Sequence, residues 1–223
     1  MQPDISAPGV NILATWLGND SSSTPQATKS PLFNVISGTS MSCPHVSGVV
    51  ASVKSQNPTW SPSAIKSAIM TTAIQTNNLG SPMTLDTGSV ATPYDYGAVE
   101  ISTNGALQPG LVYETNYISN MNYPTIAVSE LKGKESKKVI RTVTNVGGNG
   151  ETVYTVSVDA PEEVEVKVIP EKLKFAKNNE KQSYQVVFTP STLKERVFGS
   201  ITWTNGKHRV RSPFVVTSES SEP

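Results

Sequence analysis

Two patterns of apolar and polar positions follow one another along the chain. Before about residue 117, apolar residues recur at spacings of three and four, which is typical of amphipathic helices. Beyond about residue 122, short runs of alternating apolar and polar residues are separated by turn-forming glycine, proline and asparagine, which predicts strands. We therefore place a domain boundary at residues 118–122, between a first part, 1–117, and a second part, 123–218, with a tail at 219–223.

A strand-to-helix turn is predicted around Ser40. The apolar stretch 32–36 reads as a short strand, and Gly38 gives the backbone freedom for a sharp turn at its end. A helix follows, with Pro44 expected in its first turn, where a missing N–H costs nothing. Four valines at helical spacing continue the pattern until Asn57-Pro58 ends it: Val46, Val49, Val50 and Val53. Ser40 is thus expected at a helix N-terminus.

A second helix is predicted at residues 62–74. Ser61 is a good N-cap and Pro62 a good first helical residue. The expected buried stripe consists of Ala64, Ile65, Ala68 and Ile69.

The second part reads as an antiparallel β-sandwich. Asn205-Gly206 is a strong hairpin signal between its last two strands. The expected strands lie at residues 125–128, 138–145, 152–159, 164–169, 173–176, 184–189, 199–204 and 209–216. Seven or eight short strands in about a hundred residues are typical of such a sandwich.

Composition narrows the function classes. The 223 residues carry a formal net charge of zero, so there is no basic surface for nucleic acid. No apolar run approaches the ~20 residues of a membrane span, and no leading segment reads as a signal peptide. The single cysteine, Cys43, excludes an intrachain disulfide, and we expect it to be a small buried thiol. Nothing implies a metal or an organic cofactor. Asn19-Asp20-Ser21 is a possible glycosylation sequon.

The position of Ser40 gives it a chemical meaning. The first turn of a helix presents unpaired N–H groups and the positive end of the helix dipole, and both favour a developing oxyanion. One such donor is worth about 3 kcal/mol of transition-state stabilisation in acyl transfer. The alternative is that Ser40 only caps the helix.

Several motifs resemble subtilisin-like serine proteases, and the plant subtilases (cucumisin-like enzymes) in particular. The run GTSMSCPHVSG at residues 38–48 resembles the serine motif of that family, and MQPDISAPGV at 1–10 resembles the segment before it. Residues 58–73, 92–98 and 106–113 resemble later segments of the same α/β domain, which has a parallel sheet. RTVTNVG at 141–147 resembles the opening of the fibronectin type III-like domain that follows it in plant subtilases.

The resemblance implies peptide-bond hydrolysis through an acyl-enzyme on Ser40, with a protein or peptide as substrate and a secreted location. In the subtilisin order, the catalytic aspartate and histidine precede the serine. No histidine precedes Ser40, so we expect this chain to be truncated and inactive alone. His45 belongs to the serine motif, and His208 reads as a half-exposed strand residue. Asp4 lacks the sequence context of the family's aspartate.

Further features of the family are absent or altered. Asn11, Asn19 and Asn34 do not match the family's oxyanion asparagine. The sequence between Glu114 and Tyr123 is shorter than the family leads us to expect. Two alternatives to a protease part stay open, namely a noncatalytic β-sandwich interaction module and a decayed fragment without function. We also expect exposed sheet edges and uncovered helix faces in the first 115 residues.

Overall fold

The computed structural model describes residues 3–17, 32–115, 122–131, 133, 135–193 and 195–218. The predicted sequon at Asn19, most of the predicted linker and the tail 219–223 lie outside these residues. The chain divides into two compact units, one formed by Met1–Ser6 with Ser52–Pro223 and the other by Ala7–Ala51. The domain boundary at residues 118–122 stays a prediction.

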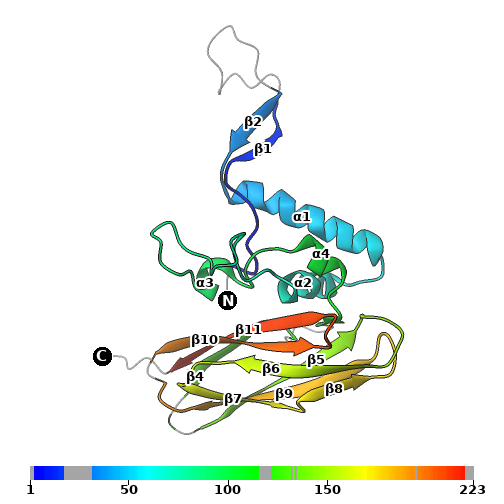
Figure 1. The fold of residues 1–223 in the computed structure, drawn as a ribbon, viewed down its shortest axis with the longest axis vertical. Coiled ribbons are helices and arrows are strands. Elements are labelled where there is room, and N and C mark those ends of the chain that lie inside the picture. The colour runs from blue at the N-terminus through cyan, green and yellow to red at the C-terminus, as the bar shows by residue number, and fades with distance from the viewer. Residues whose placement is uncertain are drawn as a thin grey trace. The chain divides into compact units, whose positions relative to one another are not determined.

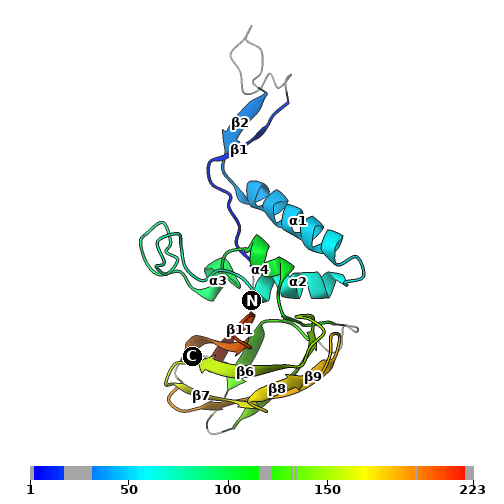
Figure 2. The same cartoon turned by 45° about the vertical axis from the view of Figure 1, so that its right-hand side comes forward.

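The sandwich consists of two sheets that lie face to face (Figure 1 and Figure 2). One has the strand order β4-β11-β10-β6-β8 and the other β3-β5-β9-β7. The strands of the first are β4 (Ile126–Leu131), β11 (Arg209–Ser218), β10 (Arg196–Thr204), β6 (Thr152–Asp159) and β8 (Lys172–Phe175). Those of the second are β3 (Leu111–Val112), β5 (Lys137–Asn145), β9 (Lys181–Pro190) and β7 (Val164–Ile169). All eight expected strands are present.

The sandwich differs from the prediction in two ways. β4 pairs with β11 in parallel, so the sandwich is not wholly antiparallel. β3 was not expected, yet it pairs with β5 and extends the second sheet ahead of the predicted boundary. A two-residue strand carries too little alternation to be recognised by sequence pattern.

Aromatic side chains fill the space between the two sheets. Trp203 of β10 and Tyr184 of β9 are buried edge to face, with ring centroids 5.1 Å apart. Phe188 and Phe214 pack in the same way at 5.2 Å. The hydroxyl of Tyr113 lies 2.6 Å from that of Tyr184 and 2.7 Å from Ser212 Oγ, so these buried polar groups satisfy one another.

Three helices belong to the same unit: α2 (Pro62–Thr71), α3 (Pro93–Tyr96) and α4 (Thr103–Leu107). Ser61 caps α2 as predicted, and its Oγ accepts a hydrogen bond from Ala64 N at 3.2 Å. The predicted stripe is buried, and Ala64 and Ala68 pack against Val112 of β3. α2 ends at Thr71, three residues earlier than expected, because the chain then pairs as a bridge between Ile74 and Glu100.

The second unit contains β1 (Ile12–Thr15), β2 (Phe33–Ile36) and most of α1 (Thr39–Gln56). β1 and β2 pair antiparallel, so the described residues do not confirm a parallel-sheet remnant. Leu13 and Val35 pair directly and Phe33 lies beside them on the same face. All three are more than half exposed, as expected for an uncovered apolar face.

Candidate active site around Ser40

Ser40 is the second residue of α1 and follows directly on a tight turn from β2. Met41 N donates to Gly38 O at 3.0 Å, which closes this turn. Ser40 is exposed. The strand, turn and helix predicted around this serine are therefore confirmed, and its Oγ is accessible.

The start of α1 corrects one expectation. Because the helix begins at Thr39, Pro44 lies inside it rather than in its first turn. A proline there has no N–H for the carbonyl of Ser40, four residues earlier. The carbonyl of Ser40, the residue expected to react, therefore lacks the hydrogen bond that it would normally accept within a helix.

Residues 7–11 form hydrogen bonds with the turn before Ser40 and with the first turn of α1. Gly38 N donates to Gly9 O at 2.8 Å, and Ser42 Oγ donates to Ala7 O at 3.0 Å. Gly9 must be glycine, since a Cβ there would lie 2.2 Å from Ser42 Oγ. Asn11 N adds a bond to Ser37 Oγ at 2.8 Å. The Ala-Pro-Gly run thus has a physical role, which is to fix the backbone that carries Ser40.

Neither histidine is placed as a base for Ser40. His45 Nδ1 lies 2.9 Å from Met41 O, within its own helix. Five residues along an α-helix also turn the side chain by about 140° from that of Ser40. His208 precedes β11 and is enclosed in the sandwich at 7% exposure, so the expectation of a half-exposed strand residue is wrong. Its burial results from packing against backbone at Gly110 and Gly147, which sequence pattern does not reveal.

Asp4 is occupied by a structural ion pair. Its carboxylate lies 2.6 Å from Lys66 Nζ and accepts a hydrogen bond from the Tyr123 hydroxyl. Burial alone would raise the pKa of the Asp4 carboxyl, but the bonds from Lys66 and Tyr123 outweigh it and lower the pKa. Lys66 also lies over the Tyr123 ring, 4.8 Å from its centroid. The carboxylate therefore holds α2 to the start of the sandwich.

The remaining candidates do not complete the site. Cys43 is exposed, so the expectation of a buried thiol is wrong: no described residue covers that side of α1. Asn34 Oδ1 accepts from Val35 N at 2.8 Å, and Asn11 lies at a positive φ of 53°. Asn19 lies outside the described residues.

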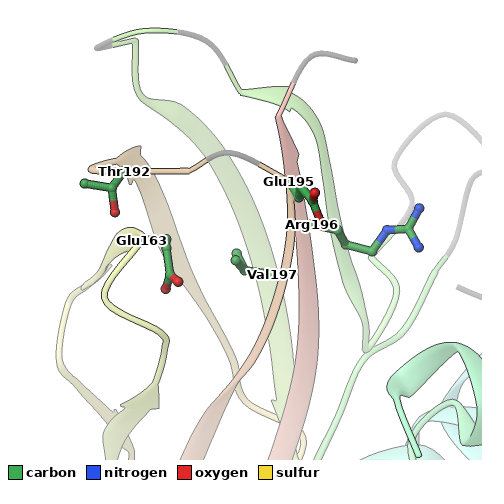
Figure 3. A pocket seen from close by; sticks show the side chains of 5 residues that line it. All are labelled: Glu163, Thr192, Glu195, Arg196 and Val197. Atoms are coloured by element: carbon green, nitrogen blue, oxygen red, sulfur yellow. The ribbon is translucent and has the colours of Figure 1, made fainter. Parts of the chain in front are cut away.

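A recess of about 550 Å³ lies at one end of the sandwich (Figure 3). Its lining residues are Glu163, Thr192, Glu195, Arg196 and Val197. Arg196 points away from Glu163 in Figure 3, and its guanidinium stacks 4.6 Å from the ring centroid of Tyr94. The residues that line the recess include no serine, cysteine or histidine.

Two further features of the described residues concern metal ions and membranes. No group of three or more histidine, cysteine or acidic residues in that part of the chain is arranged to hold a metal ion. None of its helices combines the length and the apolarity needed to cross a bilayer.

Comparison with known proteins accounts for both parts of the chain. Residues 1–98 match the subtilase family, and residues 120–216 match a fibronectin type-III domain. Among solved structures, the secreted serine protease VesC of Vibrio cholerae covers 52% of the chain at 11% identity with a TM-score of 0.36, which is too low to bear on the fold.

Relatives from plants align over nearly the whole chain. Subtilisin-like protease SBT5.1 of Arabidopsis thaliana is 50% identical over 98% of the chain, and the CO(2)-response secreted protease of that plant is 49% identical over 99%. Subtilisin-like serine-protease S of Lotus japonicus is 43% identical over 93%. The chain spans about a third of the length of these relatives, 34%, 34% and 32% respectively. The chain belongs to the plant subtilisin-like serine proteases, and corresponds to the C-terminal part of such a protein, with its fibronectin type III-like domain.

Proposed function

We propose that the chain is the serine-bearing part of a subtilisin-like endopeptidase and that Ser40 is its nucleophile. The observation that carries this proposal is the accessible Ser40 in the first turn of α1, on a backbone braced by Ala7 and Gly9. A serine that only caps a helix lies at the N-cap position, and its Oγ accepts a hydrogen bond from a backbone N–H of the first turn. Ser40 is instead the second residue of α1, inside the helix rather than at its N-cap.

The chemistry follows from that placement. Ser40 Oγ would attack the carbonyl carbon of a peptide bond and form an acyl-enzyme, which water then hydrolyses. First-turn N–H groups of α1 are suited to receive the negative charge on the carbonyl oxygen. The proton of Ser40 needs a base, and neither histidine of this chain is placed to take it.

We therefore infer that the histidine, the aspartate and the oxyanion asparagine come from polypeptide outside this chain, and that the chain alone does not turn over substrate. The exposed face of Leu13, Phe33 and Val35 supports this inference, because an apolar face of that kind calls for covering structure. The substrates would be proteins or peptides. One relative is named a secreted protease, and we propose an extracellular location for this protein as well.

A chimera tests the proposal directly. This chain would replace the corresponding third of the Arabidopsis SBT5.1 protease, which supplies the remaining two thirds. We expect a fluorophosphonate probe to label the chimera and a peptide substrate to be cleaved, and both signals to vanish in Ser40→Ala.

Two controls make the outcome decisive. The 223-residue chain alone should show no labelling while its circular dichroism reports folded structure. Ser47→Ala is a matched serine variant on α1, where Ser47 Oγ only bonds Cys43 O at 3.1 Å, and it should keep the activity of the chimera. A folded chimera that resists labelling, or one still labelled after Ser40→Ala, would refute the role of Ser40.

A further inference from the structure

His208 lies where three segments of the sandwich meet. A Cβ on Gly110, which precedes β3, would lie 2.5 Å from His208 Cβ. A Cβ on Gly147, in the connection from β5 to β6, would lie 3.1 Å from His208 Cε1. The ring therefore packs directly on two glycine backbones. These two segments are also joined to each other, since Val146 N donates to Gly110 O at 2.8 Å.

The hydrogen bonds around the ring favour one protonation state of Nδ1. Asn205 Oδ1 accepts from His208 N at 2.7 Å and from Lys207 N at 3.1 Å. These two bonds fix the amide, so that its NH₂ group faces both Thr152 Oγ1, at 3.0 Å, and His208 Nδ1, at 3.4 Å. An NH₂ group can only donate. This contact favours a ring that accepts at Nδ1, that is, an imidazole without a proton on that nitrogen.

Charges around His208 act in the same direction. Burial lowers the pKa of the imidazole below its ordinary 6.5, and the positive charge of Lys207 lowers it further. Tyr154 of β6 has its hydroxyl 3.4 Å from Nδ1, and burial raises the pKa of Tyr154 to about 12, so this group stays neutral. Pro109, Gly110 and Gly147 bring no charge. No described residue forms an ion pair with the ring.

We propose that His208 is an acid-sensitive latch: the neutral ring fastens the segment before β3 and the β5–β6 connection to the β10–β11 turn, and protonation of Nδ1 releases them. A proton on Nδ1 would face the NH₂ group of Asn205, and the Tyr154 hydroxyl, 3.4 Å away, offers it no more than a long hydrogen bond. Rotating that amide would relieve the conflict, but it would break the bonds to the N–H groups of Lys207 and His208. Acid should therefore separate these three segments before the rest of the sandwich opens. The inference is independent of catalysis by Ser40.

The direction of the pH effect is determined by the lowered pKa. An open state with a free ring titrates near 6.5, whereas the closed state titrates lower. Between these two values the open state binds one more proton. The equilibrium constant for opening therefore rises by up to about tenfold for each pH unit of acidification in this window. Above 6.5 it is independent of His208.

Amide hydrogen exchange of the full chain measures this opening. The readout is the amide of Val146, corrected for the intrinsic pH dependence of exchange. We expect its opening constant to rise on acidification below pH 6.5 in the unmodified chain and in His45→Gln, the matched variant of the exposed histidine. In His208→Gln the same constant should no longer change with pH.

Nuclear magnetic resonance tests the latch without requiring His208→Gln to fold. The chain has two histidines, so its imidazole signals can be assigned by His45→Gln. We expect His208 to lack a proton on Nδ1 at neutral pH and to titrate below the ordinary imidazole value of 6.5. A His208 that titrates at or above 6.5, or a pH-dependent opening that survives in His208→Gln, would overturn the latch.

Discussion

At the residue scale, Gly199 shows how closely the core of the sandwich is packed. It lies on β10 opposite Phe214 of β11. A Cβ at Gly199 would lie 2.2 Å from Phe214 Cζ and 2.4 Å from Asp159 O. The aromatic ring thus occupies the space that a side chain would take, and neither the ring nor the backbone oxygen can move without disturbing the sheet.

Gly199→Ala should therefore destabilise the chain by about 1–3 kcal/mol, the usual cost of an overpacked core. Urea unfolding followed by the fluorescence of buried Trp203 measures the loss. Gly150→Ala is the matched control, because no atom lies within 4 Å of a Cβ at Gly150. If the two variants unfold at the same urea concentration, the structure around residue 199 relaxes to accept the added methyl group.

Local sequence predicted the starts of helices better than it predicted burial. The helix start near Ser40 and the cap at Ser61 were recognised because their neighbours in sequence define them. Cys43 and His208 were both assigned the wrong exposure, since burial depends on segments distant in the chain. The Asn205-Gly206 turn was recognised, but the hydrogen bonds that make Asn205 a donor toward His208 Nδ1 required the structure.

At the element scale, α2 depends on its cap. Ser61 Oγ accepts from Ala64 N at 3.2 Å and also lies 2.9 Å from Ser63 Oγ. The helix packs on the sandwich along its buried face, and Ser67 Oγ accepts from Tyr113 N at 2.8 Å. An N-terminal turn that frays would therefore disturb contacts beyond the helix itself.

We expect Ser61→Ala to lower the free energy of unfolding by about 1 kcal/mol, which is typical for loss of a serine cap. Trp60, which packs on Ala64 and Ala68, is a local reporter for urea unfolding. Ser55→Ala, at an exposed position of α1, should change the same midpoint little. If the two variants behave alike, the cap contributes no stability.

Elements with strong local signals were predicted closely, while those defined by pairing were not. The strands β5 to β11 lie near their expected bounds because alternation and turn residues mark them. The parallel pairing of β4 with β11 joins segments about ninety residues apart, and no local pattern encodes it. The position of Pro44 was misjudged because proline is ordinarily a first-turn residue, and here it lies inside α1.

At the scale of the whole molecule, the two compact units differ in what holds them together. The unit of the sandwich has a continuous core that includes Tyr154, Trp203 and Phe214. In the other unit, β1 and β2 form a two-stranded sheet whose apolar face is exposed at Leu13, Phe33 and Val35. A two-stranded sheet on its own is marginally stable in water. The two units should therefore unfold separately.

Limited proteolysis of the full chain tests this difference. A chymotrypsin-like protease cuts after large apolar residues, and we expect early cuts after exposed Leu13 and Phe33 of the smaller unit, and after Leu79 in the exposed connection between α2 and α3. Phe188 and Phe214 are fully buried and should be cut only when the sandwich unfolds. Intact masses at early times should show a protected product that retains the strands from β4 to β11. If the sandwich is cut first, or if urea unfolds Trp16 of the smaller unit and Trp203 in one transition, the chain behaves as a single cooperative structure instead.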